Sequence, residues 1–412
     1  MSVAAFLCLA ALAISAEAGI HGVPAPDEKI FNVLDYGAKM DIVKFDNGPN
    51  FNKAWQAACH SNAKARVVIP KGVFYTTQVN FQGPCTTKGP IIVHLQGTVK
   101  ADADSSSFPN AQWIAIEFVD NMIFLGTGGL LDGQGASSWL AAAGQCDTNP
   151  DCTMPAMNVY VHQSSNVLIK NIHSINPKGY NFQVEDSSNV KLLRLRLSSP
   201  KDSPNTDGIH ITNSTFVRIA RSSISSGSDC VSFGEGSTNV TVDRITCSSG
   251  SGISVGVLGM VDYYGNPKKE LEVKNIIVKN VTLSDTEYGL TLKTLMTSTP
   301  NQARGIHFKD IVMNNVKKPI LIDQEIKLVE TFAQATNASH VVISDVHFTN
   351  IAGTAASEAG VTLNCSQKSH CAAEFSNISL KSSVTGKWVA CVAGTKNLAD
   401  VFHAAVGNEN CS

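Results

Sequence analysis

Two stretches of the chain, SSNVLIKNIHS at residues 164–174 and SSNVKLLRLRLSS at 187–199, place alternating apolar and polar residues after a small polar pair. Such alternation predicts strands with one buried face. Similar runs follow at 214–225, 237–249, 271–282, 304–316 and 339–351. The gaps are 23–27 residues and later 33–35, measured through Val167, Val190, Val217, Val240, Val273, Ile306 and Val341. A period of this length without helices predicts a stacked β-solenoid.

A parallel β-helix accounts best for this period. Each coil of such a fold pairs its short strands with the coils above and below, about 4.8 Å away. A leucine-rich repeat would need regular leucine spacing, and a propeller blade would need about 40–45 residues for its four strands. We also expect asparagines at the strand starts to stack in ladders, as they do in other stacked β structures.

The N-terminal part of the chain differs from these repeats. An amphipathic helix is predicted over residues 50–59 from the helical spacing of Phe51, Ala54, Trp55 and Ala58. A helix here would cap the open end of the solenoid, which otherwise exposes apolar side chains and unpaired strand edges. No stretch of 19–412 has the composition of a linker. We therefore expect one all-β domain with an N-terminal capping helix.

The first residues predict a secretory leader. The apolar run at 3–15 is shorter than the roughly 20 residues that span a bilayer, and it ends in the small-x-small pattern Ala16-Glu17-Ala18. This arrangement is typical of a signal peptide over 1–18, with a buried N-terminal helix as the alternative. No other segment reaches membrane length. We therefore expect a secreted protein that does not associate with membranes.

The cysteines fit the same compartment. Cys8 lies in the leader, which leaves ten of the 11 cysteines to pair in an oxidising environment. Short separations suggest, without fixing, the pairs Cys59/Cys85, Cys146/Cys152, Cys230/Cys247, Cys365/Cys371 and Cys391/Cys411. A metal site is the alternative, but the sequence has no C-x-x-C pair or histidine-rich partner set. Sequons fit a secreted glycoprotein and include Asn213, Asn239, Asn280, Asn337, Asn364 and Asn377.

Composition excludes two further classes of protein. Of the 412 residues, 43% are hydrophobic, which is too many for a chain that stays disordered. The 32 basic residues are balanced by 34 acidic ones, so the chain lacks the excess of Lys and Arg that binding to nucleic acid requires.

Several motifs of the chain carry a family resemblance. They are SPNTDGIHIT (203–212), SGSDCVSFGEGS (226–237), SGSGISVGVLG (249–259), YGLTLKT (288–294) and PILIDQ (319–324). In this order they resemble the motifs of polygalacturonases, the pectin-cleaving glycoside hydrolases of plants and microbes. The resemblance implies a right-handed parallel β-helix, no cofactor or metal, and hydrolysis of α-1,4-galacturonan with inversion. Inversion requires a carboxylic acid to protonate the leaving oxygen and a carboxylate to activate water about 6.5–9.5 Å away.

The resemblance assigns the catalytic positions unevenly. Asp207 matches one aspartate that holds the water, and Asp229 matches the other. The position of the family's general acid is Ser228, and the position of its supporting histidine is Ser251. A serine hydroxyl is too weak an acid near neutral pH, and general acid–base catalysis is typically worth 10²–10⁴-fold. The resemblance therefore implies weak or no hydrolysis.

The substrate-binding positions show the same mixture. The arginine of the family's R-I-K motif is Thr291 here, whereas the lysine is present as Lys293. Lys293 is expected to bind a substrate carboxylate. His210 follows the NTDG turn on an alternating strand, and we expect it to be a structural group whose hydrogen bonds are satisfied.

The spacing of three site residues is informative on its own. Asp207, Asp229 and Ser251 are each 22 residues apart, close to the length of one coil, so they are expected to form a column on one face. Two carboxylates about 4.8 Å apart on neighbouring coils should push one pKa upward. Asp229 could then serve as the acid, with Asp207 as the only base.

Three hypotheses therefore stay open from the sequence. The first is a monomeric pectin-binding protein of the hydrolase fold with little or no activity. The second is an active inverting exo- or endo-polygalacturonase that uses Asp207 and Asp229. The third is a secreted glycoprotein without enzymatic function that acts through protein partners, for instance as a decoy for pectinase inhibitors.

Overall fold

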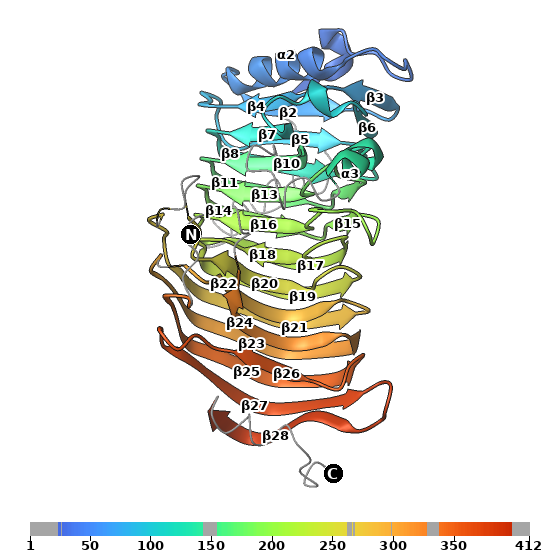
Figure 1. Ribbon diagram of the computed structural model, residues 1–412. Coiled ribbons are helices and arrows are strands. Elements are labelled where there is room, and N and C mark those ends of the chain that lie inside the picture. The colour runs from blue at the N-terminus through green and yellow to red at the C-terminus, as the bar shows by residue number, and fades with distance from the viewer. Residues whose placement is uncertain are drawn as a thin grey trace, which may run out of the picture.

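The protein forms an elongated stack of β-coils in the computed structural model, with the N-terminal helix at one end and the C-terminal strands at the other (Figure 1). Strands of successive coils pair in parallel, which confirms the predicted parallel β-helix. The structure describes residues 24–25, 27–142, 155–261, 266, 268–297, 299–327 and 338–397. The predicted leader at 1–18 lies outside these residues. None of the described helices is long and apolar enough to cross a membrane.

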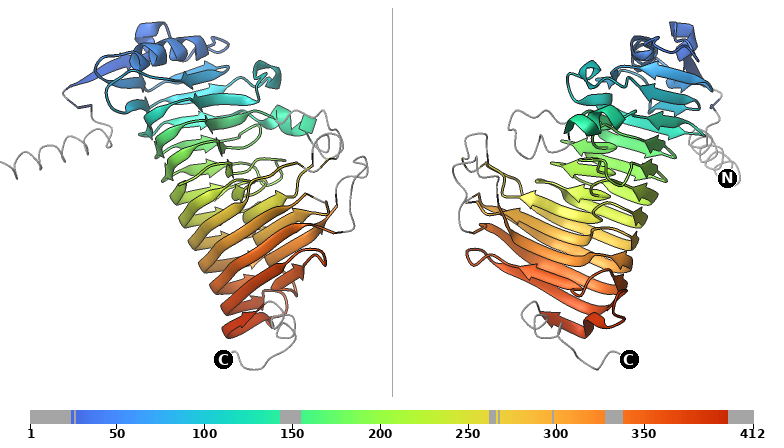
Figure 2. Two further views of the ribbon diagram at one scale, coloured as in Figure 1. Left: turned by 90° about the vertical axis from the view of Figure 1, so that its left-hand side faces the viewer. Right: turned by 45° about the vertical axis from the view of Figure 1, so that its right-hand side comes forward.

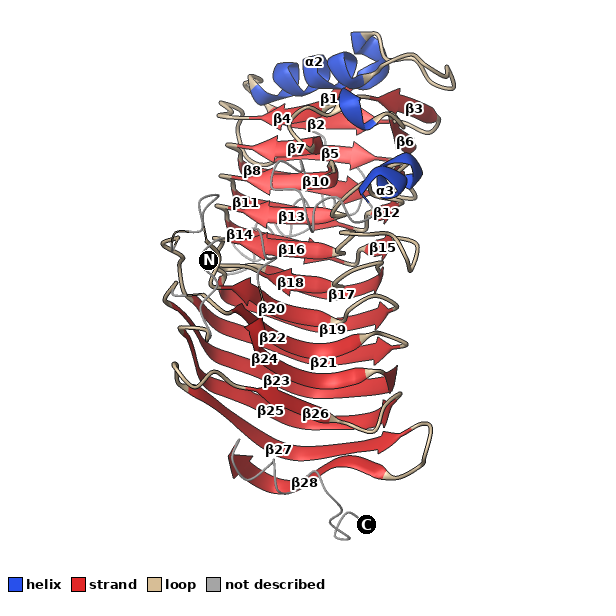
Figure 3. Ribbon diagram, in the orientation of Figure 1, coloured by secondary structure: helices blue, strands red, loops and turns tan. Residues whose placement is uncertain are grey.

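The larger sheet bends around two sides of the stack (Figure 3). Its 18 strands are β1 (Glu28–Asn32), β2 (Lys64–Ile69), β3 (Val73–Thr76), β5 (Ile91–Leu95), β6 (Thr98–Ala101), β8 (Asp120–Gly126), β9 (Leu130–Asp132), β11 (Ser165–Lys170), β12 (His173–Ile175), β14 (Ser188–Leu193), β15 (Arg196–Ser198), β17 (Arg218–Ser225), β19 (Thr238–Ser248), β21 (Val273–Ser284), β23 (Asn301–Val316), β25 (Val341–Ala355), β27 (Cys371–Ser382) and β28 (Trp388–Asn397). The strands lengthen toward the C-terminal end (Figure 2).

The smaller sheet closes the third side of the coil. Its ten strands are β4 (Val79–Gln82), β7 (Gln112–Glu117), β10 (Met157–His162), β13 (Phe182–Glu185), β16 (Ile209–Thr212), β18 (Val231–Phe233), β20 (Ile253–Leu258), β22 (Tyr288–Leu295), β24 (Lys318–Ile326) and β26 (Val361–Asn364). One coil runs through β13, β14 and β15 and reaches β16 on the next coil. Apolar residues of all three sides point inward and form one continuous core.

The register confirms the early repeat and corrects the later one. Val167 pairs with Val190, as its spacing predicted. Val240, however, pairs with Ile276 rather than with Val273, and Ile306 pairs with Val346 rather than with Val341. The markers chosen from the sequence were therefore three and five residues off. Insertions precede these strands, and the strands begin three and five residues before the partners of Val240 and Ile306, so spacing does not fix the register there.

Asparagine ladders form near the starts of the strands, as predicted. Asn189 Nδ2 donates to Asn166 Oδ1 at 2.5 Å, and Asn275 Nδ2 donates to Asn239 Oδ1 at 3.0 Å. All four residues have φ between 52° and 56°. Asparagine tolerates this left-handed region better than most residues because its short side chain hydrogen-bonds locally. At these positions asparagine therefore suits the left-handed backbone and also hydrogen-bonds to the asparagine of the next coil.

The N-terminal end is capped by helix α2 (Gly48–Cys59), which begins two residues before the predicted start. Its predicted apolar face is buried, and Trp55 packs against Phe81 with 5.1 Å between ring centroids. The Trp55 Nε1 group donates to the carbonyl of Gln82 at 2.9 Å. The sequence did not predict the short α3 (Ala136–Ala142) or the 3-10 turns η1 (Val33–Tyr36) and η2 (Ser105–Ser107).

Three of the five suggested disulfides lie within the described part of the chain. The bonds Cys59–Cys85, Cys230–Cys247 and Cys365–Cys371 are all present, which confirms these pairings. The other two suggested pairs involve Cys146, Cys152 and Cys411, which lie outside the described residues. They stay predictions.

Replacing the capping tryptophan should destabilise the fold. We expect Trp55→Ala to lower the free energy of unfolding by about 3–5 kcal/mol, because a fully buried ring and its hydrogen bond are lost. Lys53→Ala, at an exposed position of the same helix, is the matched control and should change it by less than about 0.5 kcal/mol. Thermal and denaturant unfolding measure both. Equal effects of the two substitutions would contradict a stabilising role for the buried Trp55 side chain.

Candidate active site

Three of the predicted site residues lie one above another on consecutive coils. Asp207, Asp229 and Ser251 each stand two residues before a strand of the smaller sheet, namely β16, β18 and β20. The first residues of these strands are register partners. The three residues are therefore aligned at the strand spacing of about 4.8 Å, as the 22-residue interval predicted. Figure 1 shows the three strands as neighbours in the middle of the stack.

A chain of hydrogen bonds ends at the Asp207 carboxylate. Asp207 is 5% exposed. Its Oδ2 accepts a hydrogen bond from Ser232 Oγ at 2.6 Å, and its Oδ1 accepts one from the Asp229 N–H at 3.3 Å. Ser232 Oγ lies 2.7 Å from His210 Nδ1, and Thr212 Oγ1 lies 2.8 Å from His210 Nε2. His210 is thus a structural group with satisfied hydrogen bonds, and it also positions Ser232 against Asp207.

The protonation of this chain follows from burial. Burial lowers the pKa of His210, although Asp207 and Glu185 act in the opposite direction. A neutral His210 that donates from Nδ1 to Ser232 leaves the serine hydroxyl free to donate to Asp207. Hydrogen bonds donated to a carboxylate favour its charged form. The chain of hydrogen bonds therefore directs the Ser232 hydroxyl at the Asp207 carboxyl group.

Asp229 is the protonatable member of the pair. Burial, followed by the charge of Asp207, raises the pKa of Asp229 to about 7. A hydrogen bond from Ser254 and the positive charge of Lys293 oppose this rise. Two carboxyl groups in unlike environments take different roles. Near pH 7 the Asp229 carboxyl group therefore keeps its proton in part of the molecules.

Tyr180 extends the same column by one coil. Its ring lies 4.9 Å from the His210 ring, centroid to centroid. Burial, together with the charges of Asp207 and Asp229, raises the pKa of Tyr180, so its hydroxyl keeps its proton. Sequence reasoning missed Tyr180, Ser232 and Ser254. The available signal was their spacing, because each lies about one coil from a residue already assigned to the site.

The basic side of the site is formed by β22. Lys293 Nζ lies 4.1 Å from the centroid of the Tyr288 ring, a cation–π contact that fixes the ammonium group. Tyr288 stands in the column of Ser251, because Ile253 and Leu290, which lie two residues after them, are register partners. Thr291, in contrast, is fully buried, and its hydroxyl has no hydrogen-bond partner among the described residues. Its side chain is therefore not presented to the surface.

Two serines complete the set of predicted positions. Ser228 precedes Asp229, and its carbonyl accepts hydrogen bonds from the Ser251 N–H at 2.8 Å and from Ser226 Oγ at 2.9 Å. Both Ser228 and Ser251 are half-buried beside the carboxylate pair. The structure thus brings five of the six predicted residues to one place. It supplies two carboxyl groups, of which that of Asp229 has a raised pKa, and the ammonium group of Lys293.

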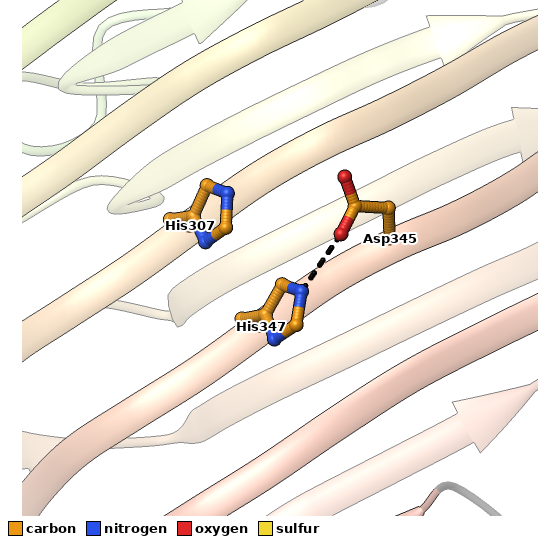
Figure 4. Close-up of side chains that lie close together, drawn as sticks. All are labelled: His307, Asp345 and His347. Carbon is orange, nitrogen blue, oxygen red and sulfur yellow. Dashed lines mark hydrogen bonds and ion pairs between the residues drawn. The ribbon is translucent and has the colours of Figure 1, made fainter.

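A separate cluster has the composition of a metal site. Nitrogen and oxygen atoms of His307, Asp345 and His347 lie within 4.8 Å of one another on β23 and β25 of the larger sheet (Figure 4). Both ring nitrogens of His347 already contact carboxylates, Nε2 with Asp345 at 2.8 Å and Nδ1 with Glu374 at 3.3 Å. An ion-pair network therefore accounts for the cluster without a metal. It shares no residue or strand with the Asp207 column.

Known proteins identify the family of this chain. Residues 59–399 match glycosyl hydrolases family 28, and the chain belongs to this family. An exopolygalacturonase from Platanus acerifolia is 38% identical over 345 residues, which cover 83% of this chain and 87% of that protein. A polygalacturonase from Gossypium hirsutum is 37% identical over 350 residues, covering 85% and 83%. The structure of an endo-xylogalacturonan hydrolase from Aspergillus tubingensis covers 87% of this chain and 94% of its own, with a TM-score of 0.72 at 22% identity.

The raised pKa of Asp229 predicts a stability change with pH. From about pH 4 to about pH 7 the folded chain keeps a proton that the unfolded chain has released, so stability falls as pH rises through this window. Asp229→Asn removes this cost. We expect the stabilisation to be greater at pH 8 than at pH 5 by on the order of 2 kcal/mol, because about two pH units of the window lie between these values.

Thermal unfolding at the two pH values measures this difference. The control is Asp202→Asn, an exposed aspartate outside the column, which should behave like the unsubstituted chain at both pH values. An Asp229→Asn variant with the same stability difference at pH 5 and pH 8 would show that Asp229 is ionised throughout.

Proposed function

We propose that the chain is a secreted polygalacturonase-family protein that binds α-1,4-galacturonan on the outer face of the smaller sheet and hydrolyses it weakly or not at all. The observation that carries the proposal is the geometry of Asp207 and Asp229. They stand on adjacent coils, linked by the hydrogen bond from the Asp229 N–H, and the described residues add no third carboxyl group at Tyr180 or Ser251, the neighbouring positions of their column.

The separation of the pair argues against a full acid–base couple. An inverting glycosidase needs its acid and its base about 6.5–9.5 Å apart, so that the sugar and a water fit between them. Neighbouring coils are only about 4.8 Å apart. Asp207 and Asp229 are therefore suited to hold one water together. The proton for the leaving oxygen would have to come from another group, and Ser228 occupies the position at which the family resemblance expects that acid.

The substrate class rests on the family and on Lys293. Curated relatives are named polygalacturonase and exopolygalacturonase, and their substrate is a polymer with a carboxylate on each sugar unit. Lys293 supplies a positioned ammonium group beside the pair, and charge-assisted hydrogen bonds to a carboxylate are among the stronger polar contacts. Secretion is proposed from the leader sequence and from the disulfides, which persist in oxidising compartments.

Restoring the missing acid tests the proposal. We expect Ser228→Asp combined with Ser251→His to release reducing ends from polygalacturonate at least about 100-fold faster than the natural chain. The matched control is Ser228→Asn with Ser251→His, which has the same size at position 228 but no transferable proton. Thr291 stays unchanged, because an arginine at that buried position would disturb the sheet. Equal rates of the natural chain and both variants would contradict a site that lacks only its acid.

The pKa of Asp229 favours a second candidate, an active inverting polygalacturonase with Asp229 as the acid and Asp207 as the base. In that case the rate of the natural chain should fall about tenfold for each pH unit above 7, as Asp229 loses its proton. Asp229→Asn should abolish the rate, and Asp202→Asn should retain it. A pH–rate profile of reducing-end release measures both. A residual rate that survives Asp229→Asn would reject this candidate.

A further inference from the structure

A groove of about 850 Å³ lies on the outside of the larger sheet, away from the carboxylate column. Four arginines line it, Arg194, Arg196, Arg221 and Arg244, together with His173 and the glycine-rich bend after β8. Arg194 lies where β14 turns into β15, whereas Asp207 lies beyond β15, on the way to β16. Arg194 and Asp207 therefore lie at opposite ends of β15.

The charge of this groove is not balanced by the protein. No aspartate or glutamate is among its lining residues, and none of the four arginines has an ion-pair partner within 4.0 Å in the described part of the chain. Arg218 and Arg304, elsewhere on the same sheet, contact Asp243 and Glu272. The exposed positive charges of the groove repel one another, so an anion placed between them would be stabilising.

Three of the arginines form a regular column. Arg194, Arg221 and Arg244 each follow directly after register partners on the consecutive strands β14, β17 and β19. Their backbones therefore lie about 4.8 Å apart along the stack. A column of cations at this repeat is suited to a linear polymer whose anionic groups also recur at each unit, rather than to a single small anion.

The backbone at these positions adds a second observation. Arg194, Arg221 and Arg244 have φ of 55°, 56° and 58°. Asn171 and Asn280 occupy the same turn on the flanking coils, also with positive φ, and asparagine suits this region. A long side chain in the left-handed region is uncommon, and strain of this kind concentrates at functional sites. At three successive coils, therefore, an arginine takes the position at which asparagine would suit the backbone better.

We propose that this arginine groove, defined by Arg194, Arg196, Arg221 and Arg244, is a second binding site for the polygalacturonate chain. The planar guanidinium group matches a carboxylate with two parallel hydrogen bonds. The site holds one segment of the polymer on the larger sheet, while another segment of pectin contacts the Asp207 column. The choice of galacturonan as the ligand rests on the proposed function, whereas the arginine groove itself does not.

The test compares polymer binding by charge variants. We expect Arg194→Gln with Arg221→Gln to weaken binding to polygalacturonate at least about tenfold at low salt and to reduce the salt dependence of the affinity. Lys191→Gln is the matched control, because this exposed lysine lies on β14, which ends one residue before Arg194, but outside the groove. Affinity electrophoresis in gels that contain polygalacturonate measures the dissociation constants.

Two further measurements keep the test decisive. Arg196→Gln changes a residue of strand β15 whose φ is not positive, so the substitution does not alter a left-handed position. It should also weaken binding. Thermal unfolding checks that each variant is folded. Fully methyl-esterified pectin, which carries no charge, should bind the natural chain and the arginine variants equally. Unchanged polygalacturonate binding by the folded arginine variants, or an equal loss with Lys191→Gln, would overturn the proposal.

Trigalacturonate separates this inference from the proposed function. This short ligand should bind the Asp207 column, so its affinity should fall with Lys293→Gln and stay constant with Arg194→Gln and Arg221→Gln. Loss of trigalacturonate binding in the arginine variants would place the only carboxylate site in the groove and overturn a second site. If Lys293→Gln left trigalacturonate binding unchanged, the proposed role of Lys293 would be rejected. The polymer-binding result would still test the arginine groove.

Discussion

The structure depends on the in-register stacking of coils through parallel backbone hydrogen bonds. Each coil can pair only with the coil above and the coil below, at a spacing of about 4.8 Å. Side chains at equivalent positions are therefore forced into columns, whatever their chemistry. Inside the stack the columns are apolar and pack as one core. Outside it, each column concentrates one kind of group at a fixed spacing.

This constraint explains why like groups meet repeatedly in the molecule. Asparagines stack near the starts of the strands and hydrogen-bond to each other. The rings of His307 and His347 stack at 4.7 Å, and His347 contacts the carboxylates of Asp345 and Glu374. Asp207 and Asp229 meet in the same manner, and the charge of Asp207 contributes to the raised pKa of Asp229. The arginine column has no ion-pair partner in the described part of the protein, which is the reason to assign it a ligand.

The sequence predicted the fold well, and the reason is physical. A strand buried on one face must alternate, and a coil of fixed circumference must repeat, so both properties are visible without coordinates. Trp55 and its helix were predictable because a solenoid needs an apolar cap at its open end. Register at Val273 and Val341 was not predictable, because insertions change the coil length without changing the alternation.

The sequence by itself determined that Asp207, Asp229 and Ser251 share a column, because 22 residues is close to one coil and adjacent coils must stack. Only the tertiary structure decided the state of that column. The raised pKa of Asp229 and the burial of Thr291 depend on contacts between different coils. These contacts depend on which residues of neighbouring coils align and on how far their packing excludes water. Neither the alignment nor the burial can be read from one segment of the sequence.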